Sequence, residues 1–276
     1  MNEETRQTLA LSLTTVRDNQ SVPVAPQVTQ LTLKFVNVCF VAEPNSERWV
    51  LIDAALPRQE KKIIAWAERL FGRQAPAAII LTHGHFDHVG SAMALSRYWQ
   101  VPIYANALEF PYLTGSMPYP PADAAAGGGV ISRISPLFSR GPFHFNEVLS
   151  PLPEDGSVPG LDAWRWLSTP GHTPGHVSLF REEDKALIAG DAFVTVQQES
   201  LHQVILQRTH LSGPPRYFTQ NWAQAFESIR LLAKLEPAVA TTGHGPPIGG
   251  TLLTNGLEHI LNHFHADHMP KHTFMN

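Results

Sequence analysis

One short segment of the chain concentrates residue types that bind metal ions. Histidine stands at positions i, i+2 and i+5 of this segment and aspartate at i+4, as His83, His85, His88 and Asp87. Imidazole nitrogens and carboxylate oxygens are the ligands that zinc and related divalent metals accept. One of these histidines alone could be an ordinary core residue, but packing does not require four polar side chains in one loop. The spacing therefore favours a metal site.

Three further residues of ligand type lie beside glycines later in the chain. They are His172, Asp191 and His244. Each follows a segment that we expect to be a strand, as His83 does, and the adjacent glycines permit tight turns there. These three residues are the remaining candidates for metal ligands.

The elements that must position these residues follow from the spacing of apolar residues. Apolar runs and alternation predict strands over residues 31–41, 49–52, 77–81, 101–105, 164–168, 177–180, 186–189 and 238–240. The first two of these strands are expected to form a hairpin around a turn at residues 44–46. Apolar stripes at helical spacing predict helices from Pro57 to Gly72, after His88 as far as Trp99, from a Thr219 cap to Pro237, and over residues 253–264. The first candidate ligands thus lie in a loop between a strand and a helix.

A long segment rich in proline and glycine interrupts this pattern. Residues 106–160 contain nine of the 23 prolines and the triplet Gly127-Gly128-Gly129. Because proline and glycine disrupt regular elements, we expect no regular core element there. The segment could be a surface excursion, but long loops in compact domains are often functional, which favours a cap over a pocket. Its aromatic residues Phe138 and Phe143 are then candidates for contact with a substrate.

The ligand candidates resemble the motifs of the metallo-β-lactamase-like superfamily. Residues 83–88 resemble the signature H-x-H-x-D-H, and residues 169–176 resemble the third motif. Asp191 is similar to the family's bridging carboxylate and His244 to its last histidine. Asp53 matches the first motif, in which the aspartate is structural rather than a ligand.

These motifs follow the family order over residues 53–245. The resemblance implies an α+β fold, a four-layer αβ/βα sandwich with the metal site at one edge. We expect residues 1–276 to form a single domain of this type, in which residues 106–160 are an insertion.

The resemblance also divides the ligands between two divalent metal ions, for which zinc is expected and iron or manganese are alternatives. It implies His83, His85 and His172 on one ion, Asp87, His88 and His244 on the other, and Asp191 between them. Two adjacent cations can hold a hydroxide at neutral pH while one of them polarises a carbonyl group. Asp87 and Asp191 are the expected catalytic residues, since Asp87 can also hydrogen-bond the hydroxide and Asp191 fixes the separation of the metals.

Other residues give weaker signals. His176 follows His172 by four positions, and we expect it to support a ligand or face solvent rather than bind metal. The histidines of residues 259–272 are expected on a solvated helix face, although the four-residue spacing of His259 and His263 could bind metal adventitiously. Phe86 and Phe193 adjoin ligands and could line a pocket or belong to the core. Cys39 is expected to be a small buried apolar residue.

Charge and hydropathy limit the partners. The formal net charge of −4 offers no overall attraction for nucleic acid. The first residues lack a basic leader, and no apolar run approaches the roughly 18 residues of a membrane span. We therefore expect a cytoplasmic protein that acts on a small molecule without nucleic acid or membrane as partner.

The motifs are similar to those of small bacterial family members of lactonase and glyoxalase II type. This implies a hydrolase that cleaves a lactone, carboxylic ester or thioester by a metal-bound hydroxide. A mononuclear iron persulfide dioxygenase is an alternative, in which His83, His172 and Asp191 hold one iron. A phosphodiesterase or nuclease is a further alternative, but it normally adds a basic surface that this composition does not provide.

Overall fold

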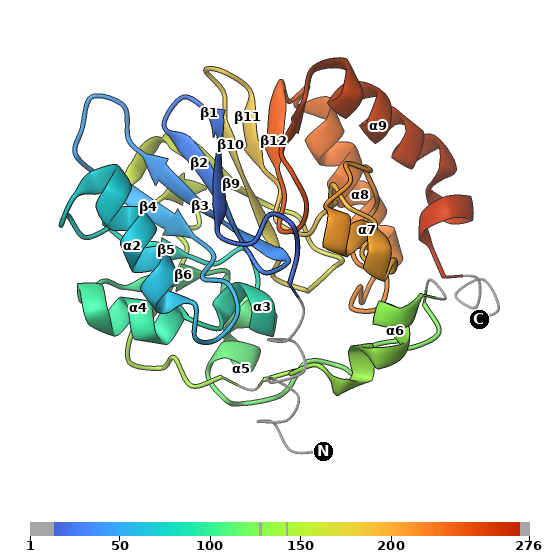
Figure 1. The fold of residues 1–276 in the computed structure, drawn as a ribbon, viewed down its shortest axis with the longest axis horizontal. Coiled ribbons are helices and arrows are strands. Elements are labelled where there is room, and N and C mark those ends of the chain that lie inside the picture. Colours follow the sequence, from blue (N-terminus) through green and yellow to red (C-terminus); the bar gives the residue numbers. More distant parts are fainter. Residues whose placement is uncertain (1–13, 127–128, 142, 271–276) are drawn as a thin grey trace.

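Two β-sheets lie face to face, and helices cover the outer face of each sheet (Figure 1). The computed structural model describes residues 14–126, 129–141 and 143–270. The layers run helix, sheet, sheet, helix, because strands that are apolar on both sides need cover on both faces. The expected four-layer αβ/βα sandwich is confirmed.

The first sheet has seven strands in chain order: β1 (Gln20–Ala25), β2 (Val28–Leu33), β3 (Val36–Ala42), β4 (Trp49–Ile52), β5 (Ile79–Ile80), β6 (Ile103–Ala105) and β7 (Leu149–Pro151). The first four strands pair antiparallel and the last four pair parallel. Helices α2 (Glu60–Phe71) and α4 (Ala92–Trp99) contribute Ile63, Ala67 and Leu95 to the core on its outer face.

The second sheet has six strands, in the order β13 (Ile248–Gly249), β12 (Val239–Thr241), β11 (Ala186–Ile188), β10 (Val177–Arg181), β9 (Leu161–Ser168) and β8 (Ser157–Val158). Helices α8 (Trp222–Lys234) and α9 (Gly250–His263) lie on the outer side of this sheet (Figure 1). Between the two sheets lies a third core cluster that includes Val41, Ile80 and Leu179, each buried completely. Burying a side chain of this kind contributes about 1.5–3 kcal/mol.

Shorter helices connect these layers. They are α3 (Phe86–Val89), the 3₁₀ helix η1 (Ala107–Glu109), α5 (Phe110–Leu113), α6 (Val130–Ile134), the 3₁₀ helix η2 (Ser135–Leu137), α7 (Leu201–Leu206) and the π-helical turn η3 (Phe264–His268). Among the described residues, no helix has the length and apolarity that a membrane crossing requires. Cys39 is buried between the sheets, as expected, and burial raises the pKa of its thiol to about 12.

Two local expectations were wrong. The apolar run at residues 31–41 is not one strand, because the chain reverses at Lys34, whose φ of 62° is left-handed, and forms the β2–β3 hairpin. The cap of α8 is Asn221 rather than Thr219, since the Asn221 side chain accepts a hydrogen bond from the backbone N–H of Gln224.

The proline-rich segment also departs from expectation. It contributes two short strands that are mostly outside the core, since β7 pairs with β6 and β8 pairs with β9. Each of these strands is the edge of its sheet. Proline is tolerated on an edge strand, where one side needs no ladder hydrogen bond, and Pro151 occupies such a position in β7. The segment without strands is therefore residues 106–148, which connect β6 to β7 within the first sheet.

Candidate metal centre

The structure brings all seven predicted ligands together at one end of the two sheets. Their donor atoms form groups within which all atoms lie within 4.8 Å of one another, namely His83 with His85 and His172, Asp87 with His88 and His244, and His83 with His88 and Asp191. These side chains come from the loops that follow β5, β9, β11 and β12 and from α3. The grouping has the division that the sequence motifs imply, while metal binding by these residues stays a prediction.

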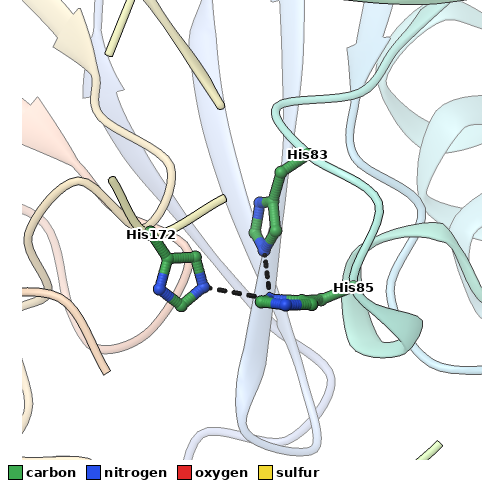
Figure 2. A group of neighbouring side chains, drawn as sticks. All are labelled: His83, His85 and His172. Carbon is green, nitrogen blue, oxygen red and sulfur yellow. Dashed lines mark hydrogen bonds between the residues drawn. The ribbon is translucent and has the colours of Figure 1, made fainter. Parts of the chain in front are cut away.

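Three imidazoles converge on a common point (Figure 2). Nδ1 of His85 lies 3.0 Å from Nε2 of His83 and 3.0 Å from Nε2 of His172. All three side chains are buried, with at most 4% of any of them exposed. This set of nitrogens matches the three-histidine face that a zinc ion accepts.

Asp191 lies between this triad and the second group. Its Oδ2 atom is 3.5 Å from Nε2 of His172, 3.6 Å from Nε2 of His88 and 3.4 Å from Nε2 of His244. One oxygen thus faces imidazoles of both groups, which is the position that a bridging carboxylate requires. The structure therefore places Asp191 where the motif comparison expects it.

Four of the histidines are oriented by a hydrogen bond from their other ring nitrogen. Nδ1 lies 2.9–3.2 Å from an oxygen in each case: Thr82 Oγ1 for His83, Asp53 Oδ2 for His88, Thr219 Oγ1 for His172 and the Phe35 carbonyl for His244. The Thr82 hydroxyl donates to Asp53 and the Thr219 hydroxyl donates to Pro215, so each accepts from its histidine. Nδ1 therefore carries a proton in each case, and Nε2 faces the centre.

Asp53 supports the centre without joining it. Its carboxylate accepts hydrogen bonds from the Thr82 backbone N–H at 2.8 Å, from the Thr82 hydroxyl at 2.8 Å and from Nδ1 of His88 at 2.9 Å. It belongs to none of the groups of candidate ligands. Its place agrees with the structural role expected for it.

His176 supports the bridging carboxylate. It is completely buried, and its Nε2 accepts a hydrogen bond from the Asp191 backbone N–H at 2.9 Å. Its Nδ1 then donates to the Thr169 hydroxyl, also at 2.9 Å. Of the two roles considered for His176, the structure favours the support of a ligand over contact with solvent.

Burial and charge set the protonation of the centre. Burial and the neighbouring imidazoles hold the pKa of His83 and of His85 well below the usual value, and burial lowers that of His172 to about 3. Although burial opposes ionisation, His244 and His88 hold the pKa of Asp191 well below its ordinary value. Burial also opposes the charged forms of His88 and His244, but Asp191 raises the pKa of both.

These residues fit a divalent cation. Buried polar atoms normally have partners, yet His88 Nε2 and Asp191 Oδ1 have no hydrogen-bond partner among the described residues. The facing lone pairs of the triad also repel one another unless a proton or a cation lies between them. Imidazole and carboxylate donors suit zinc, and also iron or manganese. The structure thus supports the binding of a divalent metal by these residues.

The four phenylalanines that were expected to contact the substrate differ in how near they lie to the centre. Phe86 and Phe138 lie with ring centroids 5.7 Å apart in the core outside the first sheet. Phe138 also approaches Phe218 at 6.4 Å, and Phe218 lies 4.7 Å from His85. Phe138 is therefore in a second layer of aromatic residues around the centre.

Phe143 and Phe193 lie farther from such a role. Phe143 packs beside Phe145 against the core outside the first sheet. Phe193 is completely buried in the core outside the second sheet, so it offers no exposed surface to a ligand. Their positions favour packing over substrate contact, which was expected for Phe193 from its neighbouring ligand and for Phe143 from the predicted cap.

Several neighbours of the centre carry no signal in the sequence. Tyr119 and Phe218 lie against His85, with ring centroids 4.6 and 4.7 Å away. Glu109 contacts two of the ligand loops. The glycines flanking the ligands were the one hint, because close approach of another group is a reason for glycine besides a tight turn.

The C-terminal histidines lie apart from this centre. His259 and His263 are exposed on α9, as expected, and their donor atoms lie within 4.8 Å of a carboxylate oxygen of Asp267. The same expectation was wrong for His268, which is buried and whose Nδ1 accepts a hydrogen bond from the Gly213 backbone N–H. His272 lies outside the described residues.

The chain is similar to known metallo-hydrolases in sequence and in structure. The sequence matches the family model of the metallo-beta-lactamase superfamily over residues 31–244. It is 44% identical over 256 residues to the probable metallo-hydrolase YflN of Bacillus subtilis, which covers 91% of this chain and 96% of YflN. Hydroxyacylglutathione hydrolase GloC of Haemophilus influenzae is 33% identical over 115 residues, which is 41% of this chain and 48% of GloC. The crystal structure of TTHA1623 in a di-iron-bound form has a TM-score of 0.55 and 26% identity, covering 88% of this chain and 98% of that one.

Proposed function

Since the chain belongs to the metallo-β-lactamase superfamily, we propose that it is a metal-dependent hydrolase that cleaves a lactone, carboxylic ester or thioester. The single observation that carries this proposal is the position of Asp191, whose Oδ2 atom lies 3.4–3.6 Å from imidazoles of both ligand groups. This arrangement suits two cations and one shared carboxylate. The di-iron-bound form of TTHA1623 supports the same number of metals.

When bound, two divalent cations would activate water at neutral pH and polarise the carbonyl group of a substrate. His83, His85 and His172 would hold one ion, and the other group would hold the second. The nucleophile is then solvent rather than a side chain. Zinc is the ion that we propose first, because it is redox-inert and accepts this mixture of nitrogen and oxygen donors.

Asp87 has a second part in this proposal. Its Oδ2 atom lies 3.5 Å from Nε2 of His244, at the edge of the second ligand group. Burial raises the pKa of Asp87 above the ordinary value. A carboxylate at this position could hold the second metal and also hydrogen-bond a water molecule bound there.

The substrate class rests on relatives rather than on a defined pocket. GloC is by name a hydrolase of hydroxyacylglutathione, a thioester, although this chain aligns with less than half of it. Hydrolysis at a carbonyl centre is therefore the reaction that we propose. A small molecule is the proposed substrate, because the net charge of −4 gives no overall attraction for nucleic acid.

The test separates hydrolysis from oxygen chemistry. Zinc-loaded protein is incubated without oxygen, in oxygen-18 water, with a panel of lactones, aryl esters and thioesters. We expect turnover of at least one class and solvent oxygen in the carboxylate product. Turnover of no compound, together with oxygen uptake when the iron-loaded protein meets a persulfide, would establish the dioxygenase alternative instead.

A further inference from the structure

Glu109 is a buried carboxylate next to the metal centre but outside its ligand groups. It ends η1, at the start of the segment that leads away from β6, and it is completely buried. It forms no ion pair with a basic side chain among the described residues. A buried carboxylate is costly unless it is well hydrogen-bonded, so its partners must explain why it is there.

Its partners are backbone groups of two ligand loops and one tyrosine. Oε2 accepts a hydrogen bond from the Gly84 backbone N–H at 2.9 Å, and Oε1 accepts one from the Gly175 backbone N–H at 2.7 Å. The Tyr119 hydroxyl donates to Oε2 as well. All three of these partners are donors, which favour the ionised carboxylate, whereas burial raises the pKa of Glu109 above its ordinary value.

The two backbone donors belong to loops from different sheets. Gly84 stands between His83 and His85 in the loop after β5, and Gly175 lies in the loop between β9 and β10 that carries His172. One side chain therefore joins the loops that supply all three imidazoles of the triad. The relative position of these loops decides whether the three nitrogens can meet.

The glycines at both contacts make room for this carboxylate. A Cβ atom at Gly84 would lie 2.5 Å from the Tyr119 hydroxyl and 3.2 Å from Oε2 of Glu109, and a Cβ at Gly175 would lie 2.8–2.9 Å from Glu109. Neither glycine is among those with positive φ, so neither is needed for a left-handed turn. Close approach of Glu109 and Tyr119 is the reason for glycine here.

We propose that Glu109 is a positioning residue that clamps the two loops, and that Tyr119 docks the segment after α5 onto this clamp. Tyr119 also lies against His85, so the clamp fixes both the spacing of the triad and the side chain beside it. The inference rests on the proposed function only in assigning the triad to a metal ion. It concerns binding of that ion rather than turnover.

Two variants test the clamp. Glu109→Gln puts an amide N–H₂ group where Glu109 accepts backbone donors, and Tyr119→Phe removes one hydroxyl. The matched control is Tyr112→Phe, since the Tyr112 ring stacks on Tyr119 at 3.8 Å and its hydroxyl forms no hydrogen bond within the described part of the chain. Each metal-stripped protein is titrated with cobalt, which is followed by its visible absorption, and circular dichroism reports the fold.

We expect Glu109→Gln to lower the affinity for one equivalent of cobalt by about tenfold or more and to change the cobalt absorption spectrum. Substitutions of residues that hold metal ligands in place have effects of this size. Tyr119→Phe should give a smaller change of the same kind in a folded protein, and Tyr112→Phe should match wild type. If Glu109→Gln does not fold, the spectrum of Tyr119→Phe decides. Wild-type affinity and spectrum in the folded variants would overturn the clamp and leave the proposed hydrolysis standing. A change in cobalt affinity or spectrum in these variants, without hydrolysis of any compound of the panel by wild type, would support the clamp and count against the proposed hydrolysis.

Discussion

Asp191 is shared by both ligand groups, and its contacts make its loss costly to each. Asp191→Ala removes the oxygen that faces His88, His172 and His244. We expect a loss of metal and of activity together, because one carboxylate serves two ions. Metal content by elemental mass spectrometry checks this, with Asp155→Ala as the control, since Asp155 is exposed and its hydrogen bonds within the described part of the chain are to Ser157 of its own turn. Wild-type metal content in Asp191→Ala would show that Asp191 does not bridge the two metal ions.

The histidines differ in the protons that they carry, which gives metal binding a pH dependence. His83, His85 and His172 have lowered pKa values and are neutral near pH 7, whereas the raised pKa values of His88 and His244 keep protons at the second group. A cation must displace those protons, so affinity at the second group should rise as pH increases towards the raised pKa values and level off above them.

Calorimetric titration of the metal-free protein checks this dependence. Carried out near pH 7 in buffers of different ionisation enthalpy, it should show proton release on metal binding. His88→Ala should reduce the number of protons released. Binding without proton release at this pH would contradict the assignment of protons to the second group.

At the scale of elements, β3 holds the last ligand loop in place. Asn37 of β3 donates from its side chain to the Thr242 carbonyl at 2.8 Å and to the Gly245 carbonyl at 2.7 Å, on either side of His244. Asn37→Ala leaves both carbonyls without these donors and should lower the free energy of unfolding by about 1–3 kcal/mol. It should also weaken metal binding.

Urea unfolding and cobalt titration measure the two effects of Asn37→Ala. Asn146→Ala is the control, because the Asn146 side chain also donates to a carbonyl, that of Thr114, but on the surface. An Asn37 variant that is as stable and binds metal as well as the Asn146 variant would show that the inter-sheet contacts are dispensable.

The elements next to the ligands were predictable because their apolar patterns are strong. Continuous apolar runs marked β4, β5, β10 and β11, which are buried on both faces. The β2–β3 turn was not predictable, since Lys34 adopts its left-handed conformation without a glycine, asparagine or proline. β7 and β8 were missed because prolines that argue against central strands are harmless at an edge.

The ligands were predictable for a different reason. Their residue types and spacing are chemical requirements, so the seven candidates could be named before any contact was known. Glu109, Tyr119 and Phe218 could not be named, because their roles depend on approaches between segments far apart in the chain. No local pattern records such an approach, apart from the glycines that leave room for it.

At the scale of the whole molecule, the ligands come from loops of both sheets. A bound ion therefore connects the two halves in the folded state, while the unfolded chain offers no preformed site. At a free metal concentration of about 100 times Kd, this linkage adds about 2.7 kcal/mol to the free energy of unfolding. We expect the Tm of wild type to rise with added zinc and fall with chelator, and the Tm of Asp191→Ala to respond less. Equal responses of the two proteins in calorimetric scans would show that zinc acts elsewhere.

The burial of the centre affects the rate at which a metal ion exchanges, as distinct from its affinity. None of the seven candidate ligands is more than 6% exposed, so we expect the surrounding loops to open before an ion leaves or enters. Exchange should therefore be slow, and the ion found in the protein should reflect the metals present while the chain folded. Isotope exchange with zinc-67 measures this rate. Substitutions that introduce glycine into the ligand loops, and so loosen them, should accelerate the exchange. Complete exchange within seconds would show that the loops open freely, and the composition of the centre would then follow the surrounding metal pool from moment to moment.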